Sequence, residues 1–368
     1  MKIVVPLGEL TRKLNAISSV VPAKTTMPIL STVLVDAGKD GIRFAATDLD
    51  ISVTSRVAGT VEEPGKIAAP AKKLAEIVKS LSGDDVTFSE TDGKLTVTCG
   101  RSRFVVNGRS AEDFPKLPQQ ESTSFFSIDP VLLIRLVSKT AYAVSTDLTR
   151  PALCGVLWDV DRSGITMVAT DGHRLAKVRG KLDLGDMARK NVIVPPKALS
   201  TLRHYAEGED QITVRIGDNS ISFDMEESSI YSRLLEGPFP SYEKVIPAKN
   251  DKELVIDRGR LSAATRRVSI LSDALTHQVI FSIDKDRVKL YVTTQELGEA
   301  TEEIDANYGG DAMEIGYNAA YIQDIMKTIE SDDVVFKLDR PDNAGVVEPG
   351  SPEENVEQLC IVMPLRIS

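Results

Sequence analysis

Apolar residues recur at the spacing of one helical face near the start of the chain, at Leu7, Leu10, Leu14, Ile17 and Val21. That spacing predicts a helix over residues 6–21. The same pattern predicts helices over 129–144 and 257–271, and shorter helical patterns follow at 70–80, 195–204 and 318–329. Each third of the chain therefore has two predicted helices.

Between the helices, apolar and polar residues alternate as they do in half-buried strands. The alternation runs up to Asp92–Gly93 and resumes from Leu95 to Cys99, which predicts a hairpin with a tight turn. A second hairpin is predicted around residues 217–219. Two helices with several antiparallel strands in each third indicate an α+β fold.

Short motifs return along the chain at a nearly constant interval. Thr47–Leu49 has a counterpart at Thr170–Gly172, 123 residues later, and another at Thr294–Glu296, a further 124 residues on. Such repetition indicates three tandem copies of one folding unit, which together fill the 368 residues. We place the copies at 1–122, 123–248 and 249–368, and call them the first, second and third repeat.

The distribution of charge separates the helices from the rest of the chain. The formal net charge is −10, yet the six predicted helices together carry +9, so all other residues carry −19. Helices favour Glu about as much as Lys and Arg, so helix propensity does not explain this separation. A repeated basic helical face suits sequence-independent contacts with duplex DNA phosphates. A repeat scaffold that binds proteins without DNA is the alternative.

The sequence contains none of the common motifs for phosphate-binding loops, zinc hydrolases or serine nucleophiles. Asp171 and His173 are the best candidates for acid–base chemistry, and an enzyme built on them is a second alternative. Asp171–Gly172 is also typical of a tight turn, after which His173 and Arg174 would begin a strand. We therefore expect no catalytic residues.

The remaining chemistry is sparse. Cys99, Cys154 and Cys360 lie too far apart for a zinc site or a disulfide framework, and we expect them, like Trp158, in the core. Residues 348–357 are rich in Glu and Pro and are expected to form a solvated loop. No apolar run suits a signal peptide or a membrane span, so we expect a cytoplasmic protein without metal or cofactor.

Six further motifs are specific enough for a comparison with known families: Ala169–Ala176, Gly100–Phe104, Asp113–Pro115, Phe239–Tyr242, Met313–Asn318 and Val362–Arg366. They resemble those of the bacterial DNA sliding clamp family, the beta subunit of DNA polymerase III. The resemblance covers the whole chain. It implies three copies of the DNA clamp fold per chain, and two chains that close head to tail into a ring around duplex DNA. It also implies no catalysis, and a role in tethering the replicative polymerase for processive synthesis.

The resemblance further implies a pocket for short peptides between the second and third repeats. Its matching positions are Leu153, Thr170, Gly172, His173, Arg174, Leu175, Pro240, Lys244, Val245, Asn318, Tyr321, Val362, Met363, Pro364, Leu365 and Arg366. Leu, Val, Met and Pro would form the apolar wall, and Arg174, Asn318 and Arg366 would orient polar groups of the peptide. The implied partners are the polymerase, the clamp loader, repair polymerases, ligase and mismatch-repair proteins.

Three positions depart from the pattern of the family. Lys244 stands where relatives often have Arg, and Thr276 where some have an aromatic residue. Pro151–Ala152 replaces tyrosines that some relatives have near DNA. Contacts with a displaced strand are therefore not expected at this place.

Basic residues are expected to contact DNA. Lys24 and Lys72 match basic positions that meet DNA in the family, and Arg203 and Arg267 lie on the basic helices.

The resemblance also places Phe104 and Val106 of one chain against Ile270 and Leu271 of the other. Ile270 points off the apolar stripe of its helix, which favours burial in an interface. For Leu271, packing inside its own repeat is the alternative.

Overall fold

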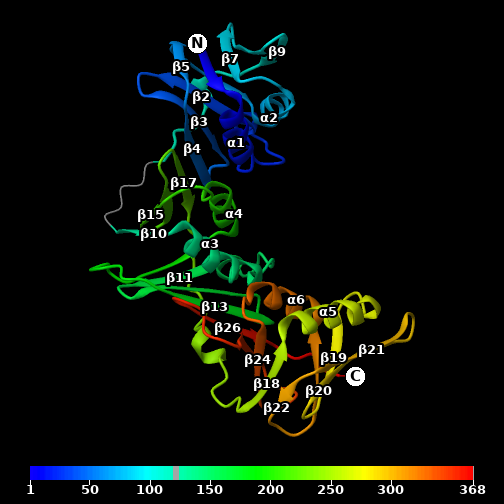
Figure 1. Ribbon diagram of the computed structural model, residues 1–368. Coiled ribbons are helices and arrows are strands. Elements are labelled where there is room, and N and C mark those ends of the chain that lie inside the picture. Colours follow the sequence, from blue (N-terminus) through cyan, green and yellow to red (C-terminus); the bar gives the residue numbers. More distant parts are fainter. Residues whose placement is uncertain (119–123, 368) are drawn as a thin grey trace. The chain divides into compact units, whose positions relative to one another are not determined.

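The computed structural model describes residues 1–118 and 124–367 (Figure 1). Contacts divide the chain into two compact units, Met1–Leu133 with Lys197–Leu234 and Ile134–Pro196 with Leu235–Ser368. The second repeat therefore contributes to both units. No described helix is long and apolar enough to cross a membrane.

All six predicted helices are confirmed within the described residues. They are α1 (Leu7–Ser18), α2 (Ala71–Ser80), α3 (Pro130–Ser138), α4 (Pro196–Tyr205), α5 (Arg258–Val268) and α6 (Ala319–Thr328). The predictions for α1, α3 and α5 were too long at the C-terminal end, because a hydrogen-bonded turn follows α1 and short 3-10 turns follow α3 and α5. The spacing of apolar residues cannot distinguish such a turn from further helix.

The first unit contains two antiparallel sheets. One has the strand order β5-β1-β7-β8-β9 and the other β10-β15-β16-β17-β4-β3-β2-β6. The strands are β1 (Lys2–Pro6), β2 (Thr32–Gly38), β3 (Gly41–Thr47), β4 (Ile51–Val57), β5 (Thr60–Glu63), β6 (Gly65–Pro70), β7 (Asp85–Thr91), β8 (Lys94–Cys99), β9 (Ser102–Asn107), β10 (Phe125–Ile128), β15 (Ile212–Ile216), β16 (Ser220–Asp224) and β17 (Ser228–Arg233).

The second unit also contains two sheets, with the orders β14-β11-β12-β13-β26-β25-β24-β18-β22 and β21-β20-β19-β23. The strands are β11 (Val156–Asp161), β12 (Gly164–Thr170), β13 (Arg174–Lys181), β14 (Lys190–Val194), β18 (Lys252–Asp257), β19 (Gln278–Ile283), β20 (Arg287–Thr294), β21 (Gly298–Asp305), β22 (Asn307–Tyr308), β23 (Met313–Asn318), β24 (Asp333–Leu338), β25 (Gly345–Pro349) and β26 (Val356–Val362).

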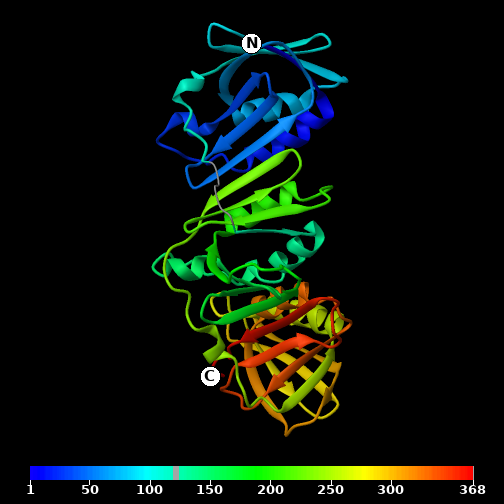
Figure 2. The same ribbon diagram turned by 90° about the vertical axis from the view of Figure 1, so that its left-hand side faces the viewer.

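Each large sheet is continuous across a boundary between repeats. In the first unit, β17 of the second repeat pairs with β4 of the first, and we call this the first joint. In the second unit, β26 of the third repeat pairs with β13 of the second, and we call this the second joint. Figure 2 shows the red β26 beside the green β13. The chain thus joins its repeats through backbone hydrogen bonds between strands.

Both predicted hairpins are confirmed. β7 and β8 meet at Asp92–Gly93, whose φ angles of 51° and 70° suit a two-residue turn of the primed type. β15 and β16 meet at residues 217–219, where the Gly217 N–H donates to the Ser220 carbonyl oxygen. The helix α1 contacts α2, and α5 contacts α6 (Figure 1). The helices of each pair also contact strands, so each pair packs against antiparallel sheet.

The repeated Thr-Asp motif forms the same turn twice. Asp48 Oδ1 accepts the N–H groups of the residues two and three positions on, and Asp171 Oδ1 does the same. The third residue of each motif has a positive φ, 82° at Leu49 and 94° at Gly172. The turn expected at Asp171–Gly172 is therefore confirmed, and β13 begins at Arg174, one residue after the expected start at His173.

Two expectations about single segments were wrong. Residues 348–357 do not form a wholly solvated loop, because the side chain of Glu353 is only 6% exposed and lies in an ion network. Cys154 lies half-buried in a 3-10 turn, whereas Cys99 and Cys360 are buried as expected. Trp158 is fully buried. Acidic residues in the sequence predicted exposed segments correctly, except where a cation distant in the sequence pairs with the carboxylate, as at Glu353.

Candidate functional site

The C-terminal segment after β26 is tied to the turn that follows β12. Val362 pairs with Arg174 at the end of the second joint, and the Met363 N–H donates to the His173 carbonyl oxygen over 2.9 Å. These bonds place the predicted pocket residues of the second repeat beside those at the end of the chain.

The same segment is also tied to the third repeat. The Leu365 N–H donates to the Gly316 carbonyl oxygen over 2.7 Å, and Gln278 Nε2 donates to the Arg366 carbonyl oxygen over 2.9 Å. Equivalent bridges return in the other repeats, where Arg109 pairs with Ala68 and Leu235 with Ile193. Periodicity did not identify Gln278, because the bond it makes spans 88 residues.

An apolar cluster lies beneath this segment. Its buried members are Leu157, Val168, Leu175, Ile193, Tyr242 and Ile361. Ala152, Phe239 and Ile246 pack against the cluster, and each is next in sequence to a predicted pocket residue: Leu153, Pro240 and Val245. The chain segments that hold Leu153, Pro240 and Val245 therefore meet at one cluster.

Two apolar side chains at this place remain accessible. Val245 is 56% exposed and Met363 is 43% exposed, whereas Leu153 and Leu175 are buried. Accessible apolar side chains in segments that adjoin a buried apolar cluster suit an apolar ligand. Pro240 and Lys244 are exposed, and Pro364 and Leu365 are half-buried.

Arg174 is engaged within the chain. Its Nε donates to Asp171 Oδ2 (3.0 Å), its Nη1 to Asp324 Oδ2 (2.7 Å) and its Nη2 to the Tyr142 carbonyl oxygen (2.9 Å). The guanidinium also lies 4.5 Å from the centre of the Tyr321 ring. Burial acts to lower the pKa of Arg174, but the Asp324 hydrogen bond and the charge of Asp171 raise it above its usual value. Arg174 therefore holds the segments of the site together.

The other polar residues of the site differ in whether their side chains are already bonded within the chain or are exposed to a ligand. Asn318 Oδ1 caps α6 by accepting the N–H groups of Ala320 and Tyr321. The Thr170 hydroxyl donates to the Arg174 carbonyl oxygen, and the Gly172 N–H donates to that hydroxyl. His173 and Arg366 have exposed side chains. Within the described chain, His173 and Arg366 are thus the side chains best placed to meet a ligand.

The three departures from the family pattern also have clear places in the structure. The Thr276 hydroxyl donates to Asp273 Oδ1. Pro151–Ala152 begins the 3-10 turn that supports Leu153, and Ala152 packs on the apolar cluster. Lys244 lies in a 3-10 turn.

The basic helix residues differ in their availability. Lys24, Lys72 and Arg203 are exposed, but Arg267 is paired with Glu302, with 2.8 Å from its Nε to Glu302 Oε2. The Glu302 hydrogen bond raises the pKa of Arg267. Arg266, its neighbour, is exposed and makes no ion pair with any described residue. The helical charge count therefore overstates the number of cations that are free to meet an anion.

Of the residues expected at a chain–chain contact, two lie on an edge strand and two lie in the 3-10 turn after α5. Phe104 and Val106 are half-buried on β9, which ends its sheet, and Ile270 is 74% exposed after α5. Leu271 is half-buried, and its carbonyl oxygen accepts from Thr294. Leu297, which sequence reasoning missed, is 57% exposed in the turn before β21, the edge strand of another sheet.

A search of the described residues finds no cluster of His, Cys, Asp or Glu that could hold a metal ion.

Models of one protein family match nearly the whole chain. The N-terminal, central and C-terminal domains of the DNA polymerase III beta subunit match residues 1–118, 127–241 and 243–366. The beta sliding clamp of Caulobacter vibrioides is 34% identical over 376 aligned residues, which cover 100% of both chains. That of Pseudomonas aeruginosa is 33% identical over 363 residues, covering 97% of this chain and 98% of the relative.

Solved structures agree with the sequence relatives. The sliding clamp of Pseudomonas aeruginosa bound to griselimycin superposes with a TM-score of 0.94 at 32% identity, and covers 100% of both chains. The DNA polymerase sliding clamp of Bacillus subtilis also gives 0.94, at 28% identity with the same coverage. Three clamp domains in tandem, matched in order and over the full length, make this chain a member of the beta sliding clamp family of DNA polymerase III.

Proposed function

We propose that two copies of this chain close head to tail into a ring that encircles duplex DNA and tethers the replicative polymerase. The observation that carries the proposal is a pair of free sheet edges, one in the first repeat and one in the third. Within the described residues, β9 pairs only with β8, and β21 pairs only with β20. Unpaired edge strands invite pairing with another chain.

The internal repeats support pairing between these two edges. β4 and β13, which each follow the Thr-Asp turn, pair across the first and second joints. β21 follows Thr294 in the same order, and β9 holds in the first repeat the place that β17 holds in the second. Pairing of β9 with β21 of another chain would repeat the joint a third time, and we call this the chain-end joint. A contact between different patches closes into a ring only when the rotation permits.

Apolar residues are available for the chain-end joint. Val105 on β9 is 48% exposed, between Phe104 and Val106, and Ile270 and Leu297 are exposed near β21. In the chain alone these side chains meet water at a free-energy cost that a partner would remove. We propose that Phe104 and Val106 contact Ile270 and Leu271, with Leu297 as an added member.

DNA would be held without sequence recognition. Lys24, Lys72 and Arg203 are exposed cations that could meet phosphates, and Arg267 could do so after leaving Glu302. Such contacts are individually weak and allow movement along the duplex. We place the clamp domains at 1–122, 123–248 and 249–368, as the repeats suggest.

Partners would dock at the cluster around Val362–Arg366. Its accessible Val245 and Met363 suit the apolar residues of a short peptide, and the exposed His173 and Arg366 suit its polar groups. We propose the polymerase, the clamp loader, repair polymerases, ligase and mismatch-repair proteins as partners. Processivity then follows from effective concentration, because a tethered enzyme rebinds before it diffuses away. The chain would act in the cytoplasm without catalysing a reaction or using a cofactor.

Retention on DNA of different topology tests the ring. Labelled protein is loaded by its clamp loader onto nicked circular DNA, which is then split into two samples. One sample is linearised, and both are passed over a sizing column. A ring stays on the circle and slides off the linear DNA. Equal retention on both, or loss from both at low salt, would refute encirclement.

A further inference from the structure

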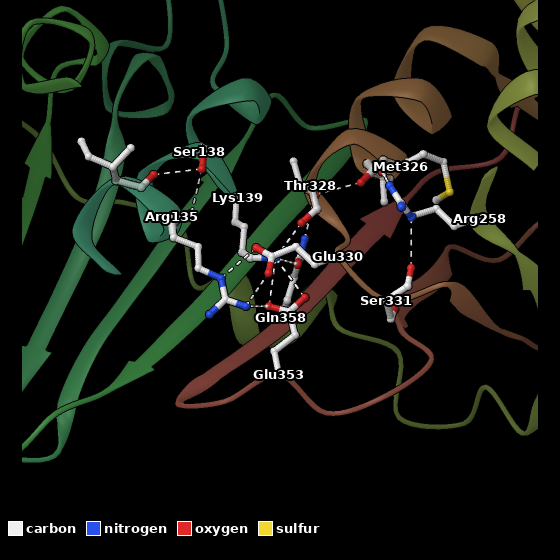
Figure 3. A network of polar contacts seen from close by, with 12 residues as sticks. Arg135, Ser138, Lys139, Arg258, Met326, Thr328, Glu330, Ser331, Glu353 and Gln358 are labelled. Carbon is white, nitrogen blue, oxygen red and sulfur yellow. Dashed lines mark hydrogen bonds and ion pairs between the residues drawn. The ribbon is translucent and has the colours of Figure 1, made fainter. Parts of the chain in front are cut away.

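At the second joint, the charged side chain of a lysine is buried. Lys139 follows α3 and is 2% exposed; its Nζ makes three hydrogen bonds and also lies 3.4 Å from Glu330 Oε1 (Figure 3). Nζ donates to the Thr328 carbonyl oxygen (2.6 Å), to Glu353 Oε1 (3.0 Å) and to Gln358 Oε1 (2.8 Å). These three bonds use every proton of the ammonium group, which is the condition for burying it.

A second cation closes the same network. Arg135 on α3 forms two parallel bonds with Glu330, Nε to Oε1 at 2.7 Å and Nη2 to Oε2 at 2.6 Å. Its Nη2 also donates to Glu353 Oε2 over 3.0 Å. The hydrogen bond from Arg135 is the largest cause that lowers the pKa of Glu330. Two cations of the second repeat thus face two carboxylates of the third.

The first joint has an equivalent network. Lys13 on α1 is 7% exposed, and its Nζ lies 3.0 Å from Glu227 Oε2 and 3.4 Å from Ser228 Oγ. Ser228 Oγ in turn lies 2.9 Å from Ser55 Oγ on the facing strand.

The two networks share one design. In each, a lysine in the first helix of one repeat or directly after it reaches a glutamate that precedes the strand added to the sheet by the next repeat. Gln358 and Ser228 also hold corresponding places in their joints, because they lie opposite Val178 and Ser55.

The residues that would form the chain-end joint lack this design. Neither α5 nor the 3-10 turn Ser269–Leu271 after it contains a lysine, and the buried residues of α5 are Leu261, Ala264, Thr265 and Val268. On the other side, the hairpin of β8 and β9 turns at Gly100–Arg101, which corresponds to Glu226–Glu227 because Cys99 lies opposite Ser102 as Met225 lies opposite Ser228. The exposed Arg101 therefore stands in the place that Glu227 has in the first joint.

We propose that Lys13 and Lys139 lock the two joints within each chain, and that the chain-end joint is built without a lock. In each locked joint the bonds of the lysine cross the boundary between repeats in addition to the strand pairing, and a variant that removes the lysine alone leaves a carboxylate at the joint without this partner. The part of the proposal about the chain-end joint rests on the two-chain ring. Strain applied to such a ring would separate the chains and leave each chain rigid.

Hydrogen exchange on the full-length protein tests the second lock. Lys139→Met keeps the length of the side chain and removes its charge. We expect exchange to rise at least tenfold in residues 353–358 and in the last turn of α6, with no change in β19 and β20. The matched control is Lys181→Met, which removes an exposed pair with Glu357 across the same joint. We expect it to change exchange by less than twofold.

A charge-balanced variant separates the lock from general loss of packing. The double variant Lys139→Met with Glu353→Gln removes the lysine charge and the charge of its partner together. We therefore expect part of the protection from hydrogen exchange to return, compared with Lys139→Met alone. If Lys139→Met does not fold, Glu353→Gln alone is measured, and should raise exchange in the same segments. Exchange in Lys139→Met equal to that in Lys181→Met would overturn the lock. The chain itself is measured, so this result does not depend on whether a ring forms.

The dissociation constant of the dimer tests whether the two locks act only within each chain. Lys13→Met and Lys139→Met should leave the dimer dissociation constant within about threefold of the parent, since neither residue belongs to the chain-end joint. A shift of a hundredfold would overturn this assignment. A parent chain that is monomeric would instead refute the proposed ring and leave the exchange result standing.

Discussion

Truncating Ile270 and Leu271 to alanine tests ring closure most directly. Ile270 is 74% exposed and Leu271 is half-buried in the chain alone, so the fold loses little from their removal. A two-chain ring has two such contacts and would lose four truncated side chains. At about 2 kcal/mol for each, the low end for buried truncations, the dimer loses about 8 kcal/mol. Because each 1.4 kcal/mol is about tenfold, the dissociation constant should rise by about five to six powers of ten.

Sedimentation velocity from nanomolar to ten-micromolar protein measures this change. We expect a nanomolar or tighter dimer to become a folded monomer at micromolar concentration, with unchanged circular dichroism. Leu148→Ala is the control, because Leu148 is 85% exposed and lies outside the proposed contact. A double variant that stays dimeric at the parent's dissociation constant would place the interface elsewhere. An unfolded variant would show that Leu271 belongs to the core of its own repeat.

Four further outcomes are expected. Deleting residues 363–368 should abolish binding of a polymerase-derived peptide by calorimetry and leave the dimer intact; unchanged affinity would exclude this segment from the site. Gly316→Ala should weaken the same binding at least tenfold, because its Cβ would lie 2.9 Å from the Leu365 carbonyl oxygen and displace the segment; an unaltered affinity would show that the segment tolerates this shift. Replacing Lys24, Lys72 and Arg203 by Glu should reduce the slope of log affinity against log salt by about one for each lost phosphate contact, and an equal slope would remove these residues from the DNA surface. The pKa of Glu330 is lowered in the folded chain, so its contribution to stability is present above the ordinary pKa of 4.5 and is lost as pH falls through the folded pKa. Glu330→Gln should therefore flatten the decline of the melting temperature below pH 4.5. Parallel curves of melting temperature against pH for the variant and the parent would contradict this.

The sequence predicted those features that depend on neighbours along the chain. Apolar spacing located all six helices because one helical face contacts the sheet every three to four residues. The turn at Asp171–Gly172 was predictable because the Asp171 carboxylate bonds to N–H groups within three residues. The ends of α3 and α5 were missed by several residues, since helix and 3-10 turn share almost the same apolar spacing.

Features that depend on distant partners could not be predicted from the residues. Glu353 looked solvated because its neighbours are polar, but its partner Lys139 lies 214 residues away in the sequence. Arg174 was matched to a ligand-binding role through family resemblance, whereas Asp324, 150 residues away, engages its guanidinium. Burial of a charge depends on which chain segments meet, and no local pattern records that.

The pairing of strands across both joints separates the unit that repeats in the sequence from the unit that folds. A segment cut out as the second repeat alone would lose the partners of both β13 and β17. It would therefore carry two long open edges, which favour aggregation. Expression of single repeats, a common route to small domains, should consequently yield insoluble protein. Fragments cut to follow the sheets would instead need pieces of two repeats, taken from separate stretches of the chain.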